Sequence, residues 1–286
     1  MDIILADERA FLLKEQLSLE QAEGRAWEKK VDAFGRIVKV ASFLQRPKDS
    51  DFELIYKEHR YEPFWHIVCR ARYVYERRRE YPNTLSGPEV QAETLDEKKF
   101  EVTNGRIHLT LTEHCREEPA RTLFLDGYSN QPDETLSQYL KYPANEVPPD
   151  HLEELGKQGA IVLPVQARAS AVVRDVLLGV LKSIQADTIL EDSVEIANVD
   201  LYYRPVYAFQ YRWRSKEKEA IVEYDAVTSE LRTDGKTFQQ YVGKLLDPEF
   251  LFDVGADTID LLVPGGGLAV KLARKGIDVA RNRSSS

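Results

Sequence analysis

Apolar residues recur at helical spacing in two separate stretches of the chain. In residues 31–44, and again in residues 172–184, they fall three or four positions apart. This spacing places them along one face of a helix. Residues 7–30 are rich in leucine, glutamate, glutamine and lysine, which predicts further helix near the N-terminus.

Each of these predicted helices is followed by a stretch in which large apolar residues alternate with other residues. Trp65, Ile67 and Cys69 occupy alternate positions in residues 63–75, as do Tyr207 and Phe209 in residues 205–213. A period of two predicts a strand with one buried face.

The two alternating stretches also share a rare pattern. Residues 61–72 and residues 203–214 both read Tyr-x-Pro, then an aromatic residue two positions on, then alternating apolar residues and Arg-x-Arg. Self-similarity in a fixed register indicates a duplicated structural unit. Because an apolar sheet face needs a cover, we expect a helix from each unit to pack on its own sheet.

The predicted fold class is therefore α+β, with two repeated helix-plus-antiparallel-sheet units. Residues 84–150 interrupt the repeat with several prolines and short alternating runs, which predict a β-rich insertion. The expected boundaries are a helical N-terminal segment at 1–30, the first unit at 31–83, the insertion and linker at 84–150, the second unit at 151–246, and a helical C-terminal tail with a glycine-rich break at 247–286.

Residues 222–231 carry a family resemblance. They read Val-Glu-Tyr-Asp-Ala-Val-Thr-Ser-Glu-Leu, which resembles the last strand of PepSY-type and cystatin-like modules. Those modules often end in Asp-Ala-x-Thr-Gly, and Ser229 stands at the position of that glycine. The resemblance implies a helix packed on a small antiparallel sheet.

Composition and charge narrow the classes of function. The net charge of -9 argues against broad nucleic-acid binding, which needs a basic face. Cys69 and Cys115 are the two cysteines, too few for a secreted disulfide framework. The first residues lack the basic start of a signal peptide, and no apolar stretch is long enough for a transmembrane segment. We expect a cytoplasmic protein.

Reaction motifs do not match their templates. His59, His66 and Cys69 are close in sequence, but a strand directs His66 and Cys69 to opposite faces, and zinc-binding spacings are absent. The glycine run at 265–267 lacks the lysine and hydroxyl of a phosphate-binding loop, so we interpret it as a break between helices at 250–262 and 268–281. We therefore predict no catalytic residue, metal or cofactor.

The repeated arginines are the main candidates for ligand binding. If the two units lie side by side, the Arg-x-Arg pairs converge into a basic strip for a carboxylate, a phosphate or a nucleic-acid backbone. In the alternative interpretation, they are solvated strand residues whose stems cover apolar surface. The candidate residues are Tyr61, His66, Arg70, Arg72, Tyr203, Arg212 and Arg214.

The predicted last helix has a basic side in an otherwise acidic chain. It can dock on the acidic body of its own chain, in a partner's groove, or on an anionic membrane surface. The candidate partner-binding residues are Lys271, Arg274, Lys275 and Arg281.

These observations favour a non-enzymatic intracellular interaction or regulatory protein that binds a protein partner or self-associates. The alternative is a binder of a small-molecule ligand, or an enzyme, that uses a cleft between the two units. A third hypothesis is a nucleic-acid accessory protein that uses the arginine strip.

Overall fold

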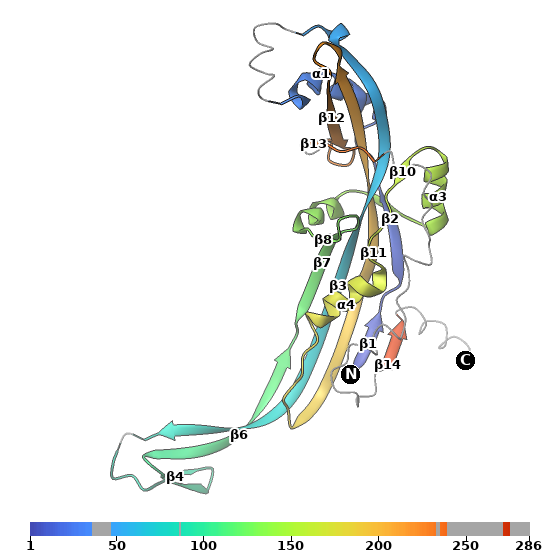
Figure 1. Ribbon diagram of the computed structural model, residues 1–286. Helices are drawn as coiled ribbons and strands as arrows, with labels where there is room; N and C mark the ends of the chain where they lie inside the picture. Colours follow the sequence, from blue (N-terminus) through green and yellow to red (C-terminus); the bar gives the residue numbers. More distant parts are fainter. Residues whose placement is uncertain (36–46, 86, 233–234, 239–270, 275–286) are drawn as a thin grey trace, which may run out of the picture.

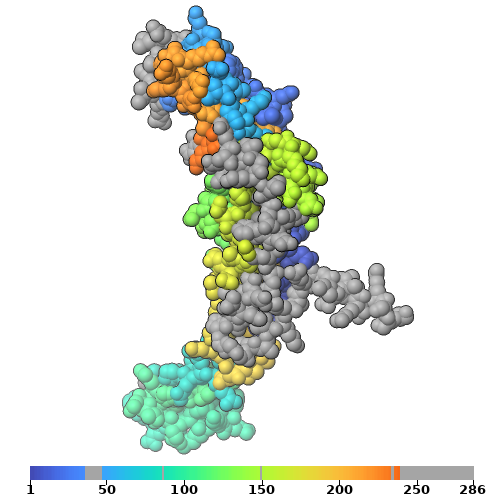
Figure 2. Space-filling model, turned by 45° about the vertical axis from the view of Figure 1, so that its right-hand side comes forward, coloured from blue at the N-terminus to red at the C-terminus, as the bar shows by residue number. Residues whose placement is uncertain are grey.

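The computed structural model describes residues 1–35, 47–85, 87–232, 235–238 and 271–274. The molecule is elongated, and one large mixed sheet runs along its length with short helices at its sides (Figure 1). At one end a narrow arm that includes β4 and β6 projects away from the body (Figures 1 and 2).

Two long antiparallel strands form the spine of this sheet. They are β3 (Phe52–Thr84) and β11 (Thr188–Trp213), paired from Phe52 opposite Trp213 to Glu76 opposite Thr188. At about 3.3 Å per residue, this pairing extends over roughly 80 Å. The alternating residues near each Tyr-x-Pro motif lie within these strands, as the sequence predicts.

Shorter strands pair along both edges of the spine. Along β11 lie β1 (Asp2–Leu5), β2 (Glu8–Leu13) and β12 (Lys218–Asp225). Along β3 lie β6 (Arg106–Glu117), β7 (Ala120–Asp126) and β10 (Ile161–Val162). The sheet is extended by β8 (Gln131–Pro132), β9 (Ala144–Val147), β13 (Leu231–Arg232) and β14 (Lys271–Arg274), and β4 (Ala92–Leu95) with β5 (Lys98–Glu101) forms a separate hairpin.

Helices occupy a smaller part of the described chain. They are α1 (Leu19–Ala33), α3 (Pro149–Lys157) and α4 (Ala169–Leu178), with 3-10 turns η1 (Asp49–Asp51), η2 (Glu134–Lys141) and η3 (Arg214–Lys216). α1 begins with a capping box, in which Ser18 and Gln21 each bond the other's backbone N–H.

The predicted α+β fold with two repeat units and helical ends is wrong. The structure is mostly β, and both Tyr-x-Pro stretches belong to one sheet. The predicted N-terminal helical segment at 1–30 is helical only from Leu19, where α1 begins. Before it the chain forms β1 and β2, and the buried residues Ile3 and Leu5 of β1 pair in parallel with β11. Helical periodicity is a weak guide in such short runs.

The predicted C-terminal helix at 268–281 is also wrong where the structure describes it. Lys271–Arg274 form strand β14, which pairs in parallel with β1. The other residues of this helix, the predicted helix at 250–262 and the glycine break lie outside the described residues. So does most of the predicted helix at 31–44, of which residues 31–33 form the last turn of α1.

The repeated motif pairs with itself. Tyr61 lies opposite Pro205, Glu62 opposite Arg204, and Pro63 opposite Tyr203. The two copies are therefore related by an approximate two-fold axis that passes between Glu62 and Arg204. Because of this axis, equivalent residues of the two copies occupy similar positions within one sheet, which is consistent with their matching sequences.

Local hydrogen bonds repeat around the same axis. After β7, the Asp126 carboxylate accepts from the backbone of Tyr128 and Ser129; after β12, Asp225 accepts from Val227 and Thr228 in the same way. The next peptides repeat as well, since Gly127 N donates to Pro63 O at 2.8 Å and Ala226 N donates to Pro205 O at 3.0 Å.

The helices cover one face of the sheet in a crossed arrangement. α1 precedes β3 but packs on Tyr207 and Phe209 of β11, whereas α4 precedes β11 but packs among the core residues around Trp65 of β3. Trp65 and Tyr207 are both buried, but they belong to two different apolar clusters.

The opposite face carries a buried network of charges around the two-fold axis. The Glu62 carboxylate is 2.8 Å from Arg60 Nε, 2.9 Å from Arg204 Nη2 and 2.7 Å from Arg232 Nη1. Arg60 also contacts Glu58 and Glu223 at 2.7 Å each. Burial opposes ionisation of Glu62, but the nearby arginines hold its pKa well below the usual range.

Replacing Glu62 tests how far the sheet depends on this network. Glu62→Gln keeps the side-chain size but removes the charge that three arginines share. We expect a loss of about 3–5 kcal/mol in unfolding free energy near neutral pH, because breaking a buried ion pair leaves uncompensated charge. Urea unfolding measures the loss.

Glu219→Gln is the matched control, because it removes the exposed partner of Arg212 and should cost less than about 1 kcal/mol. The effect of Glu62→Gln should shrink as the pH falls below the usual glutamate pKa of 4.5. A carboxylate whose folded-state pKa is lowered stabilises above that pH and loses its contribution as the pH falls toward the folded-state pKa. A loss equal to that of the control would contradict the structural role.

Candidate functional site

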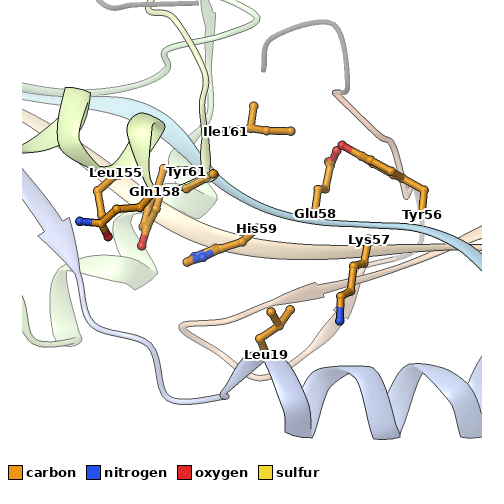
Figure 3. Close-up of a pocket in the computed structure, with 11 residues that line it drawn as sticks. Leu19, Tyr56, Lys57, Glu58, His59, Tyr61, Leu155, Gln158 and Ile161 are labelled. Carbon is orange, nitrogen blue, oxygen red and sulfur yellow. The ribbon is translucent and has the colours of Figure 1, made fainter. Parts of the chain in front are cut away.

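A cleft of about 380 Å³ lies along one edge of β3, beside the end of α3 and the start of α1. Four consecutive residues, Tyr56, Lys57, Glu58 and His59, line it. Consecutive strand residues point to opposite faces, so this set can border one cleft only along the strand edge. In Figure 3, Lys57 and His59 point to the α1 side of β3, and Tyr56 and Glu58 point to the other side.

The edge of β3 at this cleft has no partner among the described strands. β10 pairs with β3 at Arg60 and Tyr61 and does not continue toward Phe52. Leu163 N donates to Tyr61 O at 3.0 Å, so Tyr61 directs its backbone groups outward from the spine. Since this direction repeats every second residue, His59 and Lys57 present backbone N–H and C=O groups to the cleft.

A cluster of polar side chains adjoins the cleft and reaches it through His59 and Tyr61, which line it. Glu15 Oε1 is 2.9 Å from His59 Nε2, and the His59 ring packs 4.7 Å from the ring of Tyr61 and 4.9 Å from that of Tyr207. Burial opposes ionisation of Glu15, but hydrogen bonds with His59 and Tyr207 hold its pKa below the usual value. Glu15 is therefore a carboxylate at neutral pH.

The same surroundings keep the phenols of the cleft neutral. Burial raises the pKa of Tyr61 and of Tyr207, and the Glu15 charge raises both further. Away from the cleft, in the apolar core beside α4, burial raises the pKa of the Cys69 thiol to about 12. These groups are suited to hydrogen bonding and packing, since a nucleophile needs a lowered pKa or an adjacent base.

The approximate two-fold axis provides a comparison within the chain. The positions equivalent to Glu15, His59 and Tyr207 are Val165, Leu201 and Trp65, all in the apolar core beside α4. The backbone is the same in both places, as Gln16 N donates to Ala226 O and Gln166 N to Gly127 O, each at 2.8 Å. The fold is therefore built without a polar cluster in one half and with one in the other.

The structure separates the ligand-binding candidates that the sequence suggests. Tyr61 lines the cleft, whereas Tyr203 is buried at the equivalent position near α4. His66 lies on the opposite face, stacked on Phe124, with its Nδ1 3.8 Å from Asp200 Oδ2.

The repeated arginines do not form a common strip. Arg70 lies opposite Glu195 and Arg212 opposite Glu53, so the two pairs of arginines are roughly 55 Å apart along the spine. Because the two motifs run antiparallel from the Glu62–Arg204 pair, their Arg-x-Arg ends point in opposite directions along the sheet. Exposed carboxylates accompany Arg72 (Glu191, 3.2 Å), Arg212 (Glu219, 2.8 Å) and Arg214 (Glu53, 3.2 Å).

Arg70 and Arg72 do border another cleft, of about 390 Å³, on the sheet face opposite α4. Glu118, Glu191 and Glu195 line it as well, so its charges are mixed. Of the partner-binding candidates, Lys271 and Arg274 lie in β14, and Lys275 and Arg281 lie outside the described residues.

Sequence reasoning missed Glu15 and Tyr207 as partners of His59. His59 was considered only as a metal ligand, but it alternates with Tyr61 on a face that is otherwise apolar. A histidine in such a row is a signal of a polar site. Its partners came from two distant segments, which no local spacing reveals.

Comparison with known proteins gives no relative for this chain. No family model matches it, and neither a curated protein nor a solved structure does.

In the described part of the chain, no group of three or more metal-ligating side chains is placed to hold a metal ion. None of the helices described there is long and apolar enough to cross a bilayer.

The internal comparison predicts that the fold tolerates loss of the polar cluster. We expect the triple variant Glu15→Val, His59→Leu, Tyr207→Phe to keep its unfolding free energy within about 1 kcal/mol, because the Glu15–His59 contact is partly exposed to solvent and contacts of that kind contribute little to stability. Leu201→His, which places an imidazole in the apolar counterpart, should lose at least about 2 kcal/mol.

Denaturant unfolding of both variants checks this asymmetry. If the triple variant lost more stability than Leu201→His, the polar cluster would be a structural element of the fold and not a feature of a site.

Proposed function

We propose that the protein is a non-enzymatic interaction protein that binds an extended segment of a partner protein along the edge of β3. Added strands of this kind gain affinity from main-chain hydrogen bonds and specificity from pockets for alternate side chains. As the composition suggests, we place this function in the cytoplasm.

One observation carries the proposal: four consecutive residues of β3 line a cleft where the strand has no described partner on that edge. An unpaired strand edge is a template for pairing with another chain. The adjacent polar cluster, present in one half only, supplies side-chain contacts in addition to the backbone.

A small polar molecule is the second candidate for this cleft. The volume of about 380 Å³ is within the range of ligand pockets. His59, Gln158 and Tyr61 border it with hydrogen-bonding groups beside the apolar Leu19 and Leu155. Binding of such a ligand would not depend on the backbone N–H groups of β3, so a variant that removes one of them distinguishes the two candidates.

The test compares Lys57→Pro with Lys57→Ala. Both variants lose the Lys57 ammonium, 3.0 Å from Glu23, but proline also removes the backbone N–H that faces the cleft. The N–H of residue 57 points away from β11, so proline is compatible with pairing to β11.

We expect peptides selected from a random library, about twelve residues long, to bind the wild-type chain and the alanine variant similarly. The proline variant should bind them at least about tenfold more weakly, a difference of about 1.4 kcal/mol. Fluorescence anisotropy measures the affinities, and circular dichroism checks that both variants fold.

Failure to select any peptide would contradict the proposal. So would equal affinity of the proline and alanine variants, because binding would then not involve the strand edge.

A further inference from the structure

A second hollow, of about 470 Å³, lies farther along β3, between the side of α1 and the strand. Its lining is partly acidic and partly aromatic. The residues are Glu20, Glu23, Gly24, Trp27, Leu54 and Tyr211.

This hollow continues the cleft toward the end of β3. Leu54 borders the hollow and Tyr61 borders the cleft, so the two span roughly 23 Å at about 3.3 Å per residue. Lys57 lies between them and contacts Glu23, which lines the hollow. An extended segment of about seven residues reaches both.

Tyr211, which lines the hollow, has a buried hydroxyl without a hydrogen-bond partner among the described residues. The residue is 0% exposed. Buried polar groups are nearly always bonded, so this hydroxyl is available for a hydrogen bond with a polar side chain that enters the hollow. At the equivalent position in the other half stands Cys69, which lacks a hydroxyl.

The charges and rings of the hollow suit a cation. Glu20 and Glu23 contribute two carboxylates, and among the described residues the ammonium of Lys57 contacts Glu23 at 3.0 Å. Trp27 already attracts one ammonium, since Lys30 Nζ lies 4.0 Å from its ring centroid. Leu54 and Trp27 supply apolar surface for the stem of a long side chain.

A glycine keeps the hollow open. Gly24 lies inside α1, where glycine is less favourable than alanine. A Cβ built at Gly24 meets no heavy atom within 4 Å, so packing does not exclude a larger residue there. The missing side chain instead leaves space beside Tyr211 and Trp27.

We propose that this hollow receives a lysine or arginine side chain of the bound segment, whose charge meets Glu20 and Glu23 and which donates to the Tyr211 hydroxyl. The inference rests on the function proposed above, because the segment that adds to β3 carries this side chain. It also fixes the partner chemistry: a basic residue about five to seven positions from the residue that enters the cleft beside His59.

The experiment uses the peptides selected on the wild-type chain. We expect them to be enriched in lysine or arginine at one position, and replacement of that residue by norleucine to weaken binding at least about tenfold. Gly24→Leu fills the hollow and should remove the preference for the basic peptide over the norleucine peptide. Gly24→Ala, the matched control, should keep it.

Tyr211→Phe gives an independent measurement. It removes the orphan hydroxyl, so we expect weaker binding of the basic peptide and a melting temperature that is unchanged or higher.

The outcomes separate this inference from the proposed function. Peptides that depend on the backbone N–H of residue 57 but show no basic preference, or a preference that survives Gly24→Leu, would overturn the inference and leave strand addition standing. If binding of the selected peptides were insensitive to Lys57→Pro, the proposed function would fail as well.

Discussion

The antiparallel pairing of the two Tyr-x-Pro segments is the contact on which the rest of the structure depends. It places Glu62 opposite Arg204 at the centre of an approximate two-fold axis. From that axis the two long strands extend in opposite directions, so α1 and α4 each pack on the strand of the other half. The elongated shape and the crossed helices are consequences of one register.

The same pairing creates the candidate site. β11 pairs with one edge of β3 from Phe52 to Glu76. On the other edge, β10 pairs with β3 at Arg60 and Tyr61 and leaves the stretch toward Phe52 without a partner among the described strands. The edge between Phe52 and His59 borders two hollows, with α1 on one side and α3 at one end. The approximate two-fold axis relates two similar frameworks, and the polar cluster occupies one of them.

The sequence predicted local features of this arrangement well. The shared register of the motifs and the alternation in β3 and β11 are each visible in a short window. The helical spacing at 172–184 predicted α4 in part, since α4 spans Ala169–Leu178 and residues 179–184 are not helical. The register between the copies was not predictable, because alternation shows which residues face a core but not which strand lies alongside. Two self-contained units and one shared sheet bury the same aromatic residues, so the pattern of Trp65 and Tyr207 does not distinguish them.

The candidate site was less accessible to sequence reasoning. Tyr61 was found because it belongs to the repeat, whereas Glu15 and Tyr211 become relevant only when α1 crosses to β11. The repeated arginines misled the prediction because their equivalence in the motif suggested proximity. A two-fold axis relates equivalent residues but does not bring them together, and Arg70 and Arg212 lie far apart along the spine.

The distance between Arg70 and Arg212 along the spine tests this account most directly. Spin labels at Arg70→Cys and Arg212→Cys, with Cys69 and Cys115 replaced by alanine, report that distance by electron–electron double resonance. A shared antiparallel sheet predicts about 50–55 Å, the length of the strand between them. A distance below roughly 25 Å, the span of a few neighbouring strands, would contradict it and return the arginines to a common site.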